Sequence, residues 1–104
     1  MPLTTPSLQE IVAEAARVIG IDGSNGILLR DGSNAMFRLP EGVIARVAQP
    51  GRRTVAERET RVARWLADHG VSVTRPLAEV QQPTVVDDRA VTWWHALPPH
   101  RQGR

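Results

Sequence analysis

The sequence predicts an α+β domain, with a five-stranded, mostly antiparallel sheet, a helix packed on it and an amphipathic helix before it. Three observations predict this fold class. Two segments place apolar residues at helical spacing behind capping patterns. Five short runs have the composition of strands. Most neighbouring runs are separated by only a few turn-forming residues, which favours antiparallel pairing.

The first predicted helix follows Ser7. Ser7 and Glu10 have the spacing of a capping box, in which each side chain accepts a hydrogen bond from the other residue's backbone N–H. Gly20 is typical of the position just after the last turn of a helix. The apolar residues between these ends recur at helical spacing and predict one packed face: Leu8, Ile11, Val12, Ala15, Val18 and Ile19.

Three strands are predicted next, over residues 27–30, 35–39 and 43–48. The segments between them, residues 31–34 and 40–42, are short and contain glycine, which indicates tight turns. We therefore expect an antiparallel meander of three strands.

The second predicted helix opens at a capping box formed by Thr54 and Glu57 and runs to about His69, with Gly70 after its last turn. Glu57 and Arg61 have the spacing of a favourable ion pair on a helix. The predicted apolar face, which we expect to pack on the sheet, consists of Val55, Val62, Trp65 and Leu66.

The remaining strands form a predicted hairpin, over residues 84–86 and 89–94, after an extended stretch that contains two prolines. Trp93 and Trp94 are adjacent on the second of these strands, so we expect one to face the core and the other to face out. Residues 98–104 are expected to be a disordered tail or a truncated hinge.

Composition excludes several classes of protein. The chain has 104 residues, which suits one domain, and its lack of cysteine excludes disulfides and thiolate metal sites. No apolar run approaches the roughly 20 residues of a membrane-spanning helix. The N-terminal residues lack the features of a secretory signal, so we expect a cytoplasmic protein. All 13 basic residues are arginines, but they are scattered and the net charge is only +2, which disfavours nucleic-acid binding.

The order of elements and four stretches of sequence resemble the N-terminal lobe of the aminoglycoside phosphotransferase and choline-kinase-like family, which has a protein-kinase-like fold. The similarity extends from about residue 8 to residue 97, and residues 1–97 are expected to form this single lobe. The stretches that carry the resemblance are residues 28–39, 43–47, 58–59 with 64–71, and 83–86 with 90–94.

The resemblance implies that ATP binds beneath the first hairpin turn. Gly32, Ser33 and Asn34 would then lie near the phosphates, where backbone N–H groups and the Ser33 hydroxyl can donate hydrogen bonds. The Gly-x-Gly-x-x-Gly pattern of protein kinases is absent. From the residues alone, an ordinary hairpin turn is the favoured explanation of this segment.

Arg46 would take the place of the strand lysine that contacts phosphates in kinases, because this chain contains no lysine. Ile44, two residues earlier on the same face, would cover the adenine. Glu59 would be the helix carboxylate that pairs with Arg46. The alternatives are a solvent-facing Arg46 and a solvated Glu59, with Glu57 and Asp68 as competing partners.

Trp94 and His95 would begin the hinge, where backbone groups bind adenine in this family. No His-x-Asp string is present, so the catalytic base and the Mg²⁺ ligands expected from a C-terminal lobe are missing. We therefore expect weak ATP binding, Mg²⁺ only where such a lobe completes the site, and no phosphate transfer by this chain alone. The alternative is a non-enzymatic orphan lobe that acts as an interaction module. Either lobe would meet a C-terminal lobe, or a second copy, through a hinge-side face at Trp94, Leu97, Pro98 and Pro99.

Overall fold

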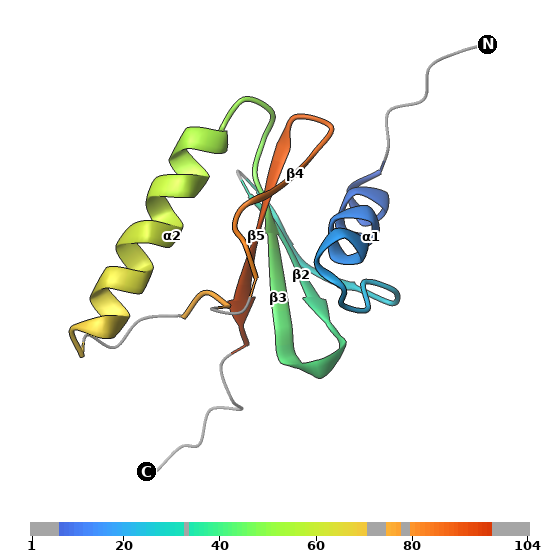
Figure 1. Ribbon diagram of the computed structural model, residues 1–104. Helices are drawn as coiled ribbons and strands as arrows, with labels where there is room; N and C mark the ends of the chain where they lie inside the picture. The colour runs from blue at the N-terminus through green and yellow to red at the C-terminus, as the bar shows by residue number, and fades with distance from the viewer. Residues whose placement is uncertain (1–6, 33, 71–74, 78–79, 97–104) are drawn as a thin grey trace.

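The computed structural model describes residues 7–32, 34–70, 75–77 and 80–96. It is an α+β fold in which one five-stranded antiparallel sheet has the order β1-β2-β3-β5-β4 (Figure 1). The fold class predicted from the sequence is confirmed at this level. The elements are α1 (Leu8–Ile19), β1 (Ile27–Asp31), β2 (Ala35–Leu39), the short 3₁₀ turn η1 (Pro40–Gly42), β3 (Val43–Val47), α2 (Arg53–Asp68), β4 (Thr84–Val86) and β5 (Arg89–His95).

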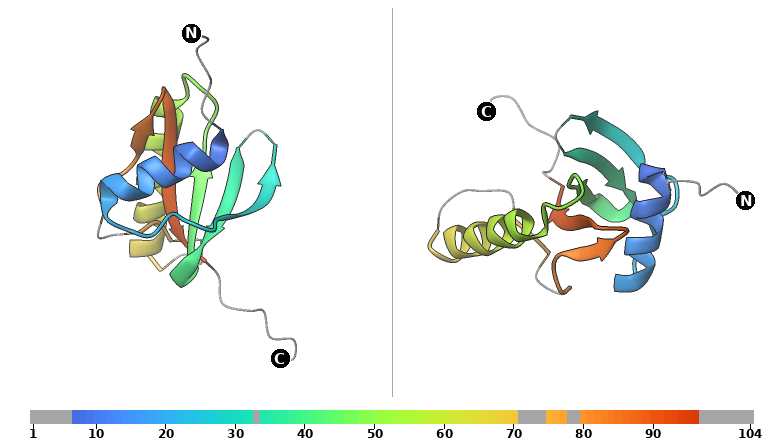
Figure 2. Two further views of the ribbon diagram at one scale, coloured as in Figure 1. Left: turned by 90° about the vertical axis from the view of Figure 1, so that its right-hand side faces the viewer. Right: turned by 90° about the horizontal axis from the view of Figure 1, so that it is seen from above.

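The sheet lies between the two helices, with α1 on one face and α2 on the other (Figures 1 and 2). The main core fills the α1 face, where alternate residues of the central strands meet the helix. Trp93 is fully buried there, and its indole N–H donates to Thr84 Oγ1 at 3.1 Å. The largest fully buried side chains are Trp93, Phe37, Ile11, Val12, Val47 and Val91.

The N-terminal capping box is present in α1. Ser7 Oγ accepts from the Glu10 N–H, and Glu10 Oε1 accepts from the Ser7 N–H. Gly20 ends the helix with φ 79°, a left-handed conformation that glycine adopts without a steric penalty. One predicted contact is wrong, because Val18 is exposed and Ala16 is buried in its place.

The beginning and the packed face of α2 differ from the prediction. Arg52, rather than Thr54, is the N-cap residue, and its side chain makes no capping hydrogen bond. Glu57 pairs with Arg53 at 3.1 Å, so the expected Thr54–Glu57 capping box is not formed. The helix buries Ala56 and Thr60, whereas the Trp65 residue is 58% exposed. Val55, Val62 and Trp65 of the predicted apolar stripe are therefore exposed, whereas Leu66 is half-buried.

The last two strands form the predicted hairpin, and Asp87 and Asp88 make its turn with positive φ values. Trp93 and Trp94 occupy opposite faces of β5, as alternation requires, but both are buried.

Leu97, Pro98 and Pro99 lie outside the described residues. The expected exposed patch at the hinge is therefore wrong for Trp94, which is 5% exposed. In the described residues, no helix has the length and apolar character to cross a membrane.

Candidate functional site

The α2 face of the sheet carries the candidate site. Register pairs Arg46 of β3 with Met36 of β2 on one side and with Thr92 of β5 on the other. Ile44 and Trp94 are paired one step further along the same face. Because side chains alternate along a strand, these residues project together from the face opposite the main core.

Arg46 lies between a carboxylate and an aromatic ring. Its Nη1 atom is 3.5 Å from Glu59 Oε1, at the long end of hydrogen-bond distance. Its guanidinium carbon lies over the Trp94 ring, 4.9 Å from the centroid, which is within cation–π range. The Arg46 side chain is 29% exposed, so its charge remains accessible to a ligand. The contact predicted between Arg46 and Glu59 is present.

Three alanines bring α2 close enough for this contact. Ala56 of α2 packs on Ala48, which follows β3, and on Ala90 of β5, and all three are buried. Methyl side chains allow a close approach between a helix and a sheet, and Glu59 follows Ala56 by three residues, almost one helical turn. Further along α2, Arg64 Nη2 donates to the Leu77 carbonyl at 2.9 Å and fastens the helix to the segment before β4.

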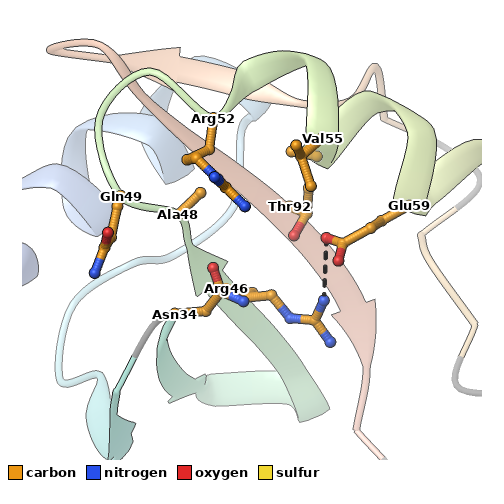
Figure 3. A pocket seen from close by; sticks show the side chains of 9 residues that line it. Asn34, Arg46, Ala48, Gln49, Arg52, Val55, Glu59 and Thr92 are labelled. Carbon is orange, nitrogen blue, oxygen red and sulfur yellow. Dashed lines mark hydrogen bonds and ion pairs between the residues drawn. The ribbon is translucent and has the colours of Figure 1, made fainter.

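A polar cavity of about 270 Å³ lies between the sheet and the N-terminal part of α2 (Figure 3). Arg52 at the start of the helix and Glu59 about two turns later both extend toward Arg46. Two arginines against one glutamate give this lining a net positive charge. The lining residues are Asn34, Arg46, Ala48, Gln49, Arg52, Val55, Ala56, Glu59 and Thr92.

A second, less polar cavity of about 290 Å³ adjoins Arg46 on the side of the last strand. Ile44 and Trp94 supply apolar surface, and His95 borders it. Arg46 lines both cavities, so a cationic side chain stands where a polar hollow meets an apolar one. The complete lining is Met36, Arg38, Ile44, Arg46, Trp94, His95 and Ala96.

The structure brings together most of the residues that the sequence singled out. Asn34, Arg46 and Glu59 line the polar cavity. Gly32 lies in the hairpin turn but lines neither of these two cavities, and open space surrounds the position of its missing Cβ. Ser33 lies outside the described residues.

The hinge backbone is partly occupied within the protein. The His95 N–H donates to the Arg75 carbonyl at 2.9 Å, and the Ala96 N–H donates to the Gly42 carbonyl at 2.8 Å. Neither N–H group is free to bind a base, which revises the expectation for the backbone of His95. Its side chain is exposed at the rim of the apolar cavity.

Sequence reasoning missed several residues of this face, above all Thr92 and Arg52. Thr92 could have been found, since it precedes Trp94 by two positions on a predicted strand and must share its face. Arg52 could be recognised only with the correct start of α2, and the capping pattern at Thr54 placed that start two residues too late. Within the part of the chain that the structure describes, no group of three potential metal ligands comes together.

Comparisons with family models, with curated proteins and with solved structures give no match for this chain.

Proposed function

We propose that this chain is the nucleotide-binding lobe of a small-molecule phosphotransferase similar to the aminoglycoside phosphotransferase and choline-kinase-like family. The observation that carries the proposal is the 3.5 Å contact between Arg46 and Glu59 beside a cavity with net positive lining. An anion such as a polyphosphate is attracted to a fixed guanidinium with several N–H donors. The neighbouring apolar cavity suits a purine, whose flat faces need no polar partners.

The two cavities suggest how ATP would lie. The adenine would enter the hollow beside Ile44 and Trp94, and the phosphates would extend past Arg46 toward Asn34 and Arg52. Arg52 stands at the N-terminus of α2, where the helix dipole adds to the attraction for negative charge. In this arrangement Glu59 holds Arg46 in place, and the phosphates bind its remaining N–H groups.

The chemistry of transfer would require groups from another polypeptide segment. No His-x-Asp string occurs in the sequence, and phosphoryl transfer depends on metal ions and a positioned hydroxyl acceptor. We therefore expect the purified chain to bind ATP weakly and to transfer no phosphate to aminoglycoside, choline or sugar acceptors. Turnover that disappears in Arg46→Ala would contradict this expectation.

The test is calorimetric titration of the chain with ATP and with adenosine. Arg46→Ala should weaken ATP binding by about tenfold or more, because hydrogen bonds to charged groups are among the strongest. Adenosine binding should fall much less than ATP binding, since adenosine carries no phosphate and meets Arg46 only at the border of the apolar cavity. The matched control is Arg53→Ala, which removes an arginine from an ion pair within α2 but outside both cavities. Equal affinity of the native chain and Arg46→Ala for ATP would refute the proposal.

A second candidate, a non-enzymatic interaction module, is favoured by the outer face of α2. Val62 and Trp65 are exposed there, and such residues at helical spacing suit a protein partner. Under this alternative the chain binds no ATP, and it associates with itself or another chain through α2. Sedimentation analysis should then show association that Trp65→Ala abolishes, whereas Arg46→Ala leaves it unchanged.

A further inference from the structure

We propose that Thr92 and Trp94 act as positioning residues that hold the Arg46 guanidinium for a ligand phosphate, in addition to Glu59. The inference rests on the proposed function for what Arg46 binds. The restraint itself follows from contacts within the chain.

Glu59 alone is a weak restraint. Its contact to Arg46 is 3.5 Å long, and the Glu59 side chain is 46% exposed, so water competes for both partners. This contact also uses only one of the five N–H donors of the guanidinium. Without a second support, the Arg46 side chain would lose considerable rotamer freedom whenever it met a phosphate.

Trp94 supplies that second support. Its ring lies under the guanidinium carbon at 4.9 Å, and a ring attracts a cation through the negative potential of its face. Trp94 is almost fully buried, so packing restricts the movement of its ring. The Trp94 ring attracts the positive charge of Arg46 and accepts none of its N–H groups in a conventional hydrogen bond. These N–H groups therefore remain available to a phosphate.

Thr92 fixes the orientation of that ring. The Trp94 indole N–H donates to Thr92 Oγ1 at 2.9 Å, and Thr92 itself is buried. An indole ring can occupy several rotamers, and this hydrogen bond favours the one that places its face beneath Arg46. Thr92 is also the register partner of Arg46 across the β3–β5 ladder, so backbone pairing fixes its distance from the arginine.

The same chain provides a matched control on the other face of the sheet. There the Trp93 indole N–H donates to Thr84 Oγ1 at 3.1 Å, with both residues buried. Thr84→Val and Thr92→Val thus remove the same type of hydrogen bond. Only Thr92→Val affects the ring beneath Arg46.

The first readout needs no nucleotide. In the NMR spectrum of the free protein, the Arg46 side-chain protons should be shifted upfield by the ring current of Trp94. Thr92→Val should move them toward their ordinary positions, Thr92→Ser should restore the shift, and Thr84→Val should leave it unchanged. Trp94→Leu, which removes the ring, should abolish the shift. This variant tests the contact even if the Trp94 ring keeps its orientation in Thr92→Val.

The second readout is ATP affinity in the same variants. Thr92→Val should weaken ATP binding about two- to fivefold, the equivalent of one cation–π contact, and should have no further effect in an Arg46→Ala background. Unshifted Arg46 protons in the native chain, or protons that neither Thr92→Val nor Trp94→Leu moves, would overturn the inference. A ring-current shift that follows the predicted pattern in a chain that binds no ATP would support the restraint and refute the nucleotide site instead.

Discussion

The Gln82 side chain pairs with the Trp93 backbone as a neighbouring strand would. Its Oε1 atom accepts from the Trp93 N–H at 2.8 Å, and its Nε2 group donates to the Trp93 carbonyl at 3.0 Å. The same Nε2 group also donates to the Leu77 carbonyl at 2.9 Å. One amide thereby joins the segment before β4 to the strand that carries Trp94.

This relationship predicts an unusual order of stabilities at position 82. Gln82→Ala should lower the free energy of unfolding by about 1–3 kcal/mol, because it leaves the Trp93 N–H of the buried strand without its partner. Gln82→Glu should be worse, since a carboxylate oxygen would face two carbonyl oxygens. Urea denaturation measures both, and Gln81→Ala, at an exposed neighbouring position, is the control. A Gln82→Glu variant as stable as the native chain would show that the amide donors contribute nothing.

The three tryptophans should differ sharply in their contribution to stability. Trp93→Ala should cost about 3–5 kcal/mol, because the ring is fully buried in the main core. Trp65→Ala should change the free energy of unfolding by less than about 0.5 kcal/mol, as for other exposed positions. Thermal denaturation of the two variants compares them directly. A large loss in Trp65→Ala would mean that the outer face of α2 packs on something in the folded chain.

The two helix N-termini should also respond differently. Ser7→Ala should destabilise the chain by about 1 kcal/mol, because Ser7 accepts from an otherwise unpaired N–H of α1. Thr54→Ala should have almost no effect, since Thr54 lies inside α2 and makes no capping hydrogen bond. Chemical denaturation of the pair is sufficient. If the two losses are equal, the N-cap of α2 lies at Thr54 rather than at Arg52.

The alanine contact beneath α2 should control the site as well as stability. Ala56→Leu adds three carbon atoms where the helix meets Ala48 and Ala90, and overpacking of this kind costs about 1–3 kcal/mol. The helix should move away from the sheet and take Glu59 with it. ATP affinity should therefore fall in Ala56→Leu, whereas Ala13→Leu, at an exposed position of α1, leaves it unchanged. If Ala56→Leu lowers stability but leaves ATP affinity unaltered, the position of α2 does not control ATP binding.

The sequence was sufficient to predict the elements of this fold, because local chemistry decides them. Ser7, Gly20 and the turn at Asp87 and Asp88 act over a few residues, and the strands between them alternate regularly. The contact between Arg46 and Glu59 could be predicted through the family resemblance, and the structure contains it.

The packed face of α2 could not be predicted by hydrophobicity. Val55, Val62 and Trp65 form the more apolar stripe, yet the helix turns Ala56 and Thr60 toward the sheet. Small residues permit the close approach of α2 to β3 and β5. The Thr60 hydroxyl donates to the Ala56 carbonyl at 3.2 Å, so it has a hydrogen-bond partner although it is buried. Periodicity identifies a stripe, but the shape of the surface opposite decides which stripe is buried.

The three tryptophans are intrinsic fluorescence probes that lie in three different environments. Because tyrosine is absent, near-ultraviolet absorbance and fluorescence come almost entirely from three indoles. Trp93 reports on the main core, Trp94 on the cavity beside Arg46, and Trp65 on the outer face of α2. Aqueous quenchers reach Trp65 first, so the emission that survives quenching comes from the two buried indoles. Trp65→Phe would leave only these two, and a change in their emission on adding a nucleotide would then originate next to the ligand.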